Sequence, residues 1–507
     1  MLDIILLILT LTFSRIAVIY LHSRYFKLEF RGDAAEHFVL FKHIRKNPNL
    51  TNIPQYLIPN KLTYPKTFHR LSSLFSIATI KKFPYLPNLI IYIVFTIIYL
   101  SYSAFIFQEI FPNSAKSSLI LVIGFFIISA SNLNFTGNNI LYLGFSERYL
   151  SKVSSALFVY TLSIFLILDN NVSFAIAILA GSLAILSSKF GRQLVFFSTG
   201  LFCIGFLSLI PLLVTCLSLF IAFLFGRTYF IKSLVHGFIY SIKIYKPYIK
   251  KSFHTSKVLS YFVNLSRLWQ LVRVGRIRSI FNYLTSREPT RTLYFLPELV
   301  LLIILSARSS VEINYYIPVI ILLALYLVTS TKAFNHFGES FRYLEFGLYY
   351  YIPFLIVLLA SNYSNPASIL VFYIPISIFH LMRSIRNVNQ IAWPSTIQPF
   401  LKKYPLNEED RVYPVSMRLA VELCSYSDCR VLYPQTGGIT NASQWEHYIQ
   451  DYPYLSTSIN SLVLEHKISC IVIRKIEMTN LPFTYDFTPF FRDYEDEEYL
   501  VYKTNNF

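Results

Sequence analysis

The sequence predicts a mainly α-helical membrane protein with about 10–11 spans and a small α/β domain at its C-terminal end. Apolar residues make up 54% of the 507 residues, and charged residues only 14%, against about 25% in an ordinary soluble domain. The carboxylates are also segregated, because 15 of the 27 lie in residues 401–507. This composition excludes a disordered chain and argues against a soluble enzyme.

Long apolar runs predict the individual spans. A helix needs about 20 mostly apolar residues to cross the bilayer core. The run at 194–226 exceeds one straight crossing, so Pro211 either divides it into two spans or lies within one long, tilted helix. The candidate spans lie near 2–21, 88–108, 117–134, 149–168, 172–187, 194–226, 294–307, 314–331, 346–361 and 366–383.

Two domains are expected from this pattern. Residues 1–394 form a transmembrane domain that contains a long loop at 22–87 and a basic loop at 227–293. Residues 395–507 form a small α/β unit, because short apolar runs alternate with helical segments and predict a partly parallel sheet. The expected strands lie at 429–433, 468–473 and 499–502, and the expected helices at 414–425 and 453–465.

The net charge of +18 comes from 45 basic and 27 acidic residues. Residues 232–291 hold 12 Lys and Arg with Glu288 as their one acid, whereas 401–507 hold 10 basic against 15 acidic residues. Apolar residues alternate with arginines in the basic segment, which predicts amphipathic helices on a charged leaflet. We therefore expect membrane lipids, and not nucleic acid, as the partner of the positive charge.

The membrane topology has two solutions. If 194–226 crosses once, the basic loop and the C-terminal domain lie in the cytoplasm, as the excess of positive charge favours. If it crosses twice, both lie outside. In either solution the loop 22–87 and residues 135–148 share the non-cytoplasmic side, where chemistry is expected.

Only twelve carboxylates precede residue 401, and a carboxylate in an apolar body is costly unless it is used or paired. In Arg31-Gly-Asp-Ala-Ala-Glu-His37 the glycine suits a turn and Asp33 suits a helix N-cap. The spacing then places Asp33, Glu36 and His37 on one helix face. One carboxylate there could act as a general base, or Asp33 could simply cap the helix.

Polar motifs that flank later spans are further candidates. His69 and Arg70 precede the second span, where they could bind a phosphate or lie at the interface. Glu147 is the single carboxylate between residues 110 and 168. It could be a second catalytic acid or could complement the positive end of a helix. Lys189 and Arg192 could bind phosphate or pyrophosphate, or form a charged loop.

The segment Phe337-Gly-Glu-Ser-Phe-Arg-Tyr343 is the last candidate. Glu339 and Arg342 are spaced to pair on a helix, yet a guanidinium also suits a phosphate. Tyr343 follows directly. Glycine-rich nucleotide motifs and zinc-protease motifs are absent from the sequence, which argues against nucleotide-driven transport and soluble-type metal chemistry.

The order of these motifs resembles the GT-C superfamily of polytopic membrane glycosyltransferases. One span is followed by a large outer loop that opens with Gly32-Asp33. A Tyr64-Pro65 to His69 segment then leads into the second span. Ser146-Glu147-Arg148, Gly338 to Tyr343 and a small α/β tail follow in that order.

The resemblance implies sugar transfer from a polyprenyl-phosphate or pyrophosphate donor to a glycan, lipid or protein acceptor on the outer face of a bacterial or archaeal cytoplasmic membrane. It implies catalytic roles for Asp33 and Glu147. It implies substrate-binding roles for Glu36, His37, His69, Arg70, Lys189, Arg192, Glu339, Arg342 and Tyr343. No cofactor is firmly expected, although a divalent metal would suit Asp33 and Glu147 if they converge.

Three other functions fit parts of the pattern. A polysaccharide polymerase or ligase outside GT-C would also use polyprenyl carriers but would depend more on arginines of the outer loops. A lipid-linked oligosaccharide flippase would show ionisable residues within its spans and two related halves, and the halves of this sequence are unrelated. A membrane scaffold would use the basic segment to bind anionic lipid or an acidic partner.

Overall fold

The structure is a computed structural model of the chain. It describes residues 9, 30, 33–58, 64–110, 145–243, 263–287, 290–307, 311–331, 334, 340–362, 396–434, 442–449, 454–456, 459–478 and 485–504. Glu339 and the spans predicted at 117–134 and 366–383 lie outside these residues, as does nearly all of the span at 2–21.

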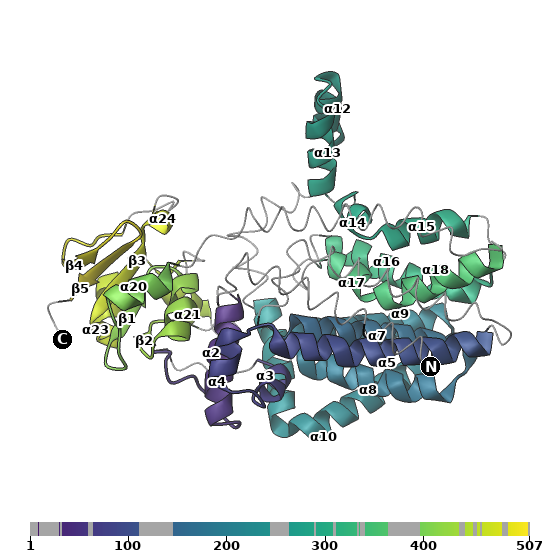
Figure 1. Ribbon diagram of the computed structural model, residues 1–507, viewed down its shortest axis with the longest axis horizontal. Helices are drawn as coiled ribbons and strands as arrows, with labels where there is room; N and C mark the ends of the chain where they lie inside the picture. Colours follow the sequence, from purple (N-terminus) through teal and green to yellow (C-terminus); the bar gives the residue numbers. More distant parts are fainter. Residues whose placement is uncertain are drawn as a thin grey trace.

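The body of the described structure is a bundle of apolar helices (Figure 1). Four of its helical segments are long and apolar enough to cross a membrane, namely Leu86–Ile110, Arg148–Leu168, Ile210–Lys243 and Ile313–Ser330. α7 is the central one, because 89% of its most apolar stretch is buried within the protein. The bundle helices are α5 (Leu86–Ile110), α7 (Arg148–Leu168), α8 (Asn171–Ser187), α9 (Lys189–Gly205), α10 (Ile210–Ile239), α15 (Pro297–Ser306), η3 (Ile313–Tyr315), α16 (Ile317–Ser330), α17 (Phe341–Phe346) and α18 (Leu348–Asn362).

The long apolar run at 194–226 is divided between two helices. α9 ends at Gly205, Leu207 adopts a left-handed φ of 49°, and Pro211 stands in the first turn of α10. α10 then returns along the bundle, so that Ser233 in its second half accepts a hydrogen bond from Arg192 near the start of α9. The structure thus has the arrangement of the two-crossing solution, in which the start of the basic loop lies at the same end of the bundle as the loop 22–87.

Three short helices of that loop cover this end of the bundle. They are α2 (Asp33–Lys46), α3 (Thr67–Ser72) and α4 (Ile77–Lys82). Phe38 and Phe41 of α2 and Phe68 of α3 surround the buried ring of Phe145, with ring centroids 5.1 to 6.1 Å apart. Aromatic burial of this kind fixes α2 firmly against the bundle.

The C-terminal domain contains a five-stranded sheet in the order β2-β1-β3-β5-β4. β1 pairs in parallel with β2 and β3, whereas β5 pairs antiparallel with β3 and β4. The small, partly parallel α/β unit predicted from the sequence is therefore present. Its elements are α20 (Ile397–Lys403), β1 (Arg411–Pro414), α21 (Met417–Tyr426), β2 (Arg430–Val431), α22 (Ala442–Ile449), α23 (Ile459–His466), β3 (Cys470–Arg474), α24 (Lys475–Met478), β4 (Phe491–Glu495) and β5 (Tyr499–Lys503).

This domain is joined to the outer loop through its sheet edge. The amide of Val431 in β2 donates to the carbonyl of Gln55 (2.8 Å), and Leu57 donates back to Val431 (2.9 Å). Lys42 of α2 also reaches Asp428 (3.1 Å). The helices α2 to α4 consequently stand between the bundle and the domain, as Figure 1 shows, and the domain lies on the same side as the loop.

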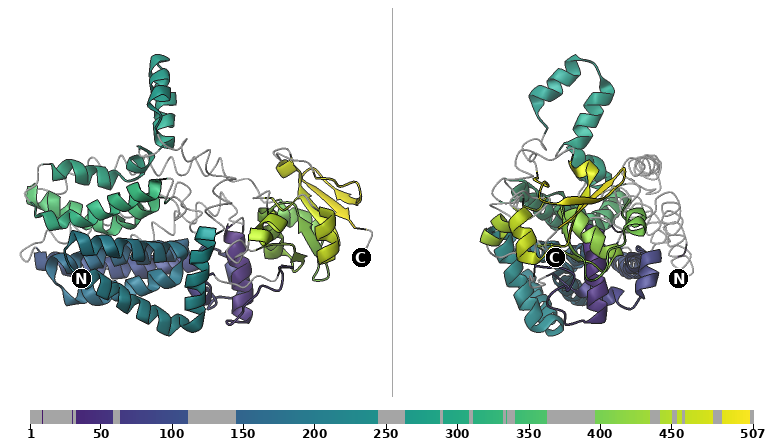
Figure 2. Two further views of the ribbon diagram at one scale, coloured as in Figure 1. Left: turned by 180° about the vertical axis from the view of Figure 1, so that it is seen from behind. Right: turned by 90° about the vertical axis from the view of Figure 1, so that its left-hand side faces the viewer.

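The basic loop contributes a helical hairpin, α12 (Leu265–Arg273) and α13 (Ile277–Ser286), followed by the short α14 (Thr290–Phe295). A turn at Gly275, which has a left-handed φ of 66°, joins the two helices. In both views of Figure 2 the hairpin projects beyond the edge of the bundle, crosswise to the spans.

Candidate functional site

The polar cluster at the loop end of the bundle is centred on His37. α2 begins at Asp33, as predicted, and one turn later places the His37 ring inside the protein. Nε2 of His37 lies 2.5 Å from Oε2 of Glu147, and both side chains are at most 5% exposed. The carboxylate of Asp33 lies 3.7 Å from the same nitrogen. The two carboxylates predicted to be catalytic thus meet at one imidazole.

Neighbouring side chains hold this pair in place. The Tyr64 hydroxyl donates to Oε1 of Glu147, and Nδ1 of His37 lies 3.0 Å from Nε2 of the buried His69. Glu147 stands at the N-cap position of α7, yet its side chain makes no capping hydrogen bond there. The carboxylate instead faces His37, so direct pairing and not helix capping explains its position.

The electrostatics assign protonation states to the cluster. Burial alone would lower the pKa of His37, but the carboxylates of Glu147 and Asp33 outweigh it and raise that pKa to about 9. Burial would raise the pKa of Glu147, and the charge of His37 reverses this and holds it below its usual range. Burial and the charged His37 lower the pKa of His69. His37 is therefore the cation, and His69 the neutral acceptor of its second N–H.

Asp33 differs from Glu147 in its access to solvent. Its side chain is 44% exposed and is held by Nε of Arg148 at 3.0 Å. The Asp33 carboxylate is therefore accessible to a substrate. The oxygens of the nearly buried Glu147 instead face His37 and Tyr64. The structure separates the two predicted acids into an accessible group and an enclosed group.

The predicted cations gather where α9, α10 and α17 meet. The Lys189 ammonium lies 4.4 Å from the centre of the Tyr240 ring, and the Arg342 guanidinium lies 4.1 Å from that of Phe190. Arg192 is buried and donates to the carbonyl of Ile185 (2.8 Å). Lys189 is the most accessible of the three, being half-buried where the arginines are buried.

The cationic group and the His37 cluster lie on helices that are joined by a hydrogen bond between two serines. The hydroxyls of Ser151, one turn after Glu147 on α7, and Ser188, the N-cap of α9, are 2.5 Å apart. Burial and the charge of Arg192 lower the pKa of Lys189 to about 8, and the carboxylates of Glu36 and Glu147 oppose this. Acidic and cationic residues thus lie on neighbouring helices, α7 and α9.

His69, Arg70 and Tyr343 are the remaining predicted residues, and their surroundings differ. His69 is fully buried behind His37, so its position suits holding His37 and does not suit contact with a phosphate. Arg70 is exposed and donates to the carbonyl of Pro48 (3.4 Å). Tyr343 is buried within α17. Tyr64 and Arg148 also contact the cluster but are not among the predicted site residues. The only sequence signal for them is that each lies in one of the polar motifs that flank the spans.

As placed in this structure, the carboxylates of the cluster face cations and hydrogen-bond donors of the protein. Both oxygens of Glu147 face the protonated His37 and Tyr64, and Asp33 faces Arg148, so positive charge already occupies the space between the carboxylates. Within the part of the chain that the structure describes, no three His, Cys, Asp or Glu side chains are grouped to hold a metal ion.

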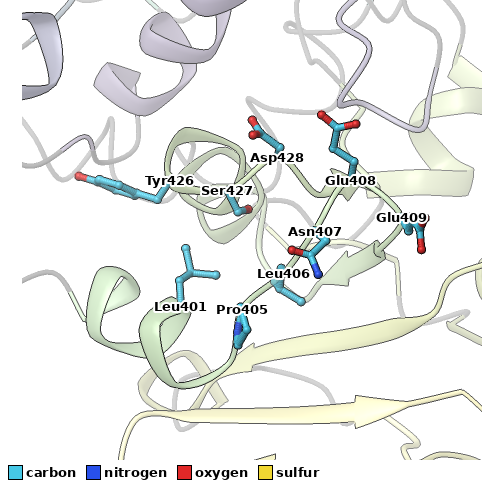
Figure 3. Close-up of a pocket in the computed structure, with 9 residues that line it drawn as sticks. All are labelled: Leu401, Pro405, Leu406, Asn407, Glu408, Glu409, Tyr426, Ser427 and Asp428. Carbon is cyan, nitrogen blue, oxygen red and sulfur yellow. The ribbon is translucent and has the colours of Figure 1, made fainter. Parts of the chain in front are cut away.

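A separate hollow of about 710 Å³ opens on the C-terminal domain, beside its contact with α2 (Figure 3). One wall is acidic and includes Asp428, which is paired with Lys42. Tyr426 accepts a hydrogen bond from the amide of Phe30 (2.9 Å), which connects the wall to the chain that leads to Asp33. The hollow is lined by Leu401, Pro405, Leu406, Asn407, Glu408, Glu409, Tyr426, Ser427 and Asp428.

Comparison with known proteins supplies the fold family. No protein-family model and no curated protein sequence matches the chain. Solved structures do match, among them the Archaeoglobus fulgidus oligosaccharyltransferase described as a complex with zinc and sulfate. It is 12% identical, with a TM-score of 0.54, and the match covers 89% of this chain and 64% of that chain. That enzyme is a GT-C membrane glycosyltransferase. The chain has the GT-C fold.

Two further structures of the archaeal enzyme agree. The GT-C fold of this chain matches its apo form at 11% identity and a TM-score of 0.53, over 99% of this chain and 74% of that chain. It also matches AglB of A. fulgidus, described in complex with an inhibitory peptide and a dolichol-phosphate, at 11% identity and a TM-score of 0.51, over 93% and 70%. The fold predicted from motif order is therefore confirmed, while the chain spans about two thirds of the length of the first relative.

Proposed function

We propose that this protein is a membrane glycosyltransferase that transfers a sugar from a polyprenyl-phosphate or pyrophosphate donor to an acceptor on the non-cytoplasmic face, with Asp33 as the general base. The observation that carries the proposal is the half-exposed Asp33 carboxylate, held beside the enclosed His37–Glu147 pair. The GT-C fold adds support, because a related structure is described with a dolichol-phosphate.

The reaction needs one bond formed and one broken. The acceptor attacks the anomeric carbon of the sugar while the bond from that carbon to the phosphate oxygen breaks. Asp33 accepts the proton that the acceptor loses, which is the role of a general base. The phosphate leaves with its negative charge, and we assign Lys189 and Arg342 to stabilise that charge.

Glu147 has a supporting role in this proposal. Its buried carboxylate keeps His37 protonated, and the resulting cation faces Asp33 at 3.7 Å. His37 and Nε of Arg148 both face the same oxygen of Asp33, Oδ2, and together they orient the carboxylate. Glu147 is then a positioning residue, and we expect its loss to reduce turnover less than the loss of Asp33.

The acceptor class is a finer part of the proposal. The related structure described with an inhibitory peptide favours a protein acceptor, and the 44% exposure of the Asp33 side chain leaves it accessible to such an acceptor. A glycan or lipid acceptor requires the same proton transfer, so parallel assays with the three acceptor classes decide between them.

The test is sugar transfer by the full chain, reconstituted in vesicles with radiolabelled polyprenyl-phosphate and pyrophosphate donors. General-base catalysis contributes about 10²–10⁴-fold, so we expect Asp33→Asn to lower turnover by at least about a hundredfold. Asp486→Asn is the matched control, because Asp486 is a fully exposed carboxylate of the C-terminal domain. Unchanged turnover in a folded Asp33→Asn variant would refute the assignment.

The donor side is tested separately with Lys189→Gln. In this proposal Lys189 binds the phosphate and not the acceptor, so its loss should raise the KM for the donor while leaving the KM for the acceptor unchanged. An equal rise in both constants would contradict the placement of the phosphate beside α9.

A further inference from the structure

The hairpin α12–α13 has no role in the proposed reaction, yet its sequence and position are unusual. None of the residues of α12 is buried. The apolar side chains of Leu265, Trp269 and Ile277 are 76%, 58% and 81% exposed. An exposed apolar surface of this kind marks an interaction site in a folded protein.

Each helix of the hairpin has one apolar stripe. In α12 the stripe contains Leu265, Leu268, Trp269 and Val272, and in α13 it contains Ile277, Ile280, Phe281 and Leu284. The spacing i, i+3, i+4, i+7 places each set on a single helix face. Both helices are therefore amphipathic, and each would leave an apolar face in water if nothing covered it.

The polar residues of the hairpin carry charge of one sign. Residues 263–287 contain five arginines and no Asp or Glu. Three arginines lie against aromatic rings of the hairpin: Arg273 over Trp269 at 5.6 Å, and Arg267 and Arg287 over Tyr283 at 5.9 and 5.5 Å. A basic polar face beside an aromatic and aliphatic face is typical of helices that lie in the headgroup layer of a membrane.

The position of the hairpin fits that layer. It emerges just before α14 and α15, on the half of the bundle nearer to α2, and it projects crosswise to the spans (Figures 1 and 2). An element that leaves the bundle in this direction runs along the membrane surface. The acidic C-terminal domain lies apart from it in both figures, so that domain does not cover the hairpin.

We propose that α12 and α13 form a lipid-binding hairpin, which inserts its apolar stripes into the leaflet on the site side and binds anionic phosphate headgroups through its arginines. The occupant is the lipid surface, because it alone offers an apolar layer directly beside a layer of negative charge. The proposal is independent of the proposed reaction, since it depends only on the surface chemistry and placement of the hairpin.

The test uses the full chain in lipid nanodiscs with Trp393→Phe and Trp445→Phe, which leaves Trp269 as its single tryptophan. We expect lipids brominated near the headgroup to quench Trp269 fluorescence, and aqueous acrylamide to quench it weakly. Strong acrylamide quenching with no quenching by brominated lipid would place Trp269 in water and overturn the proposal.

The arginines are tested by lipid composition. One basic residue near an anionic surface contributes about 1 kcal/mol, which is about a fivefold change in binding. Arg267→Gln, Arg276→Gln and Arg278→Gln together should abolish the extra lipid quenching that anionic lipid produces. The same charge change on the C-terminal domain, at Arg418, Arg430 and Arg492, is the matched control and should preserve it.

The unmodified chain provides a measurement that needs no substitution. Trypsin cleavage at the five hairpin arginines should be at least several-fold slower in nanodiscs with anionic lipid than in zwitterionic ones, while cleavage at Arg430 stays constant. Equal hairpin cleavage in both lipids would contradict anionic headgroup binding and would point to a protein partner instead.

Discussion

The His37–Glu147 pair allows a quantitative prediction, because removal of His37 leaves a carboxylate enclosed without its cation. In His37→Gln the Glu147 side chain stays at about the same burial, 5% exposed in the native protein. Breaking a buried ion pair by removing one partner costs about 3–5 kcal/mol. At about 1.4 kcal/mol per tenfold change, the opening equilibrium of α2 should rise by about 150-fold to several thousandfold.

Hydrogen exchange of the full chain in nanodiscs measures this opening directly, since amide protection reports local opening free energies. The α2 peptides should lose protection in His37→Gln. The double variant His37→Gln, Glu147→Gln should recover most of it, because no charge remains buried. His43→Gln is the control in the same helix, since His43 makes one partly exposed hydrogen bond to Gln55 and its loss should cost about 1 kcal/mol. Native protection in His37→Gln, or equal loss in the single and double variants, would refute the reasoning.

Three further predictions follow from the same structure. Because the pKa of His37 is raised to about 9, protonated His37 stabilises the folded protein fully below its ordinary pKa of 6.5, and this stabilisation is lost as the pH rises towards about 9. After correction for intrinsic exchange, the hydrogen-exchange protection of α2 should therefore fall across that range in the native chain. It should not fall in His37→Gln. Lys152→Met should lower the thermal stability markedly, because it strips the buried Glu345 of its ion-pair partner at about 3–5 kcal/mol, and Glu345→Gln added to it should restore part of the loss in a melting assay. Gly191→Ala should destabilise the bundle, since its Cβ would lie 2.2 Å from the carbonyl oxygen of Ala184. Gly200→Ala should be tolerated, because a Cβ at that position meets open space. Equal melting temperatures for the two glycine variants would contradict this packing.

Local sequence patterns predicted those parts of the fold that depend on neighbouring residues. The start of α2 at Asp33 and the shared face of Asp33 and His37 follow from helix spacing. The strand at 468–473 follows from its apolar run and appears as β3. By contrast, β4 has a mostly exposed pattern, with no alternation that would predict a strand, and was not predicted.

Contacts between distant segments could not be predicted in the same way. Glu147 suits a helix N-terminus on local grounds, yet its side chain faces His37, which is 110 residues earlier in the sequence. The role of Tyr64 as a donor to Glu147, and that of Arg148 as a partner of Asp33, depend on the packing of α3 and α7. Such pairings follow from tertiary structure, which one sequence without an alignment does not reveal.

The junction between the outer loop and β2 also has a consequence for biosynthesis. Gln55 donates to the carbonyl of Ser427, which is 372 residues away in the sequence, and the backbone of Gln55 to Leu57 extends the edge of the C-terminal sheet. A ribosome therefore completes the loop long before it synthesises the strand that pairs with it. Closure across so long a separation is slow, and until then the outer face of α2 lacks its cover. Until then Lys42 of α2 also lacks Asp428, its ion-pair partner in the C-terminal domain.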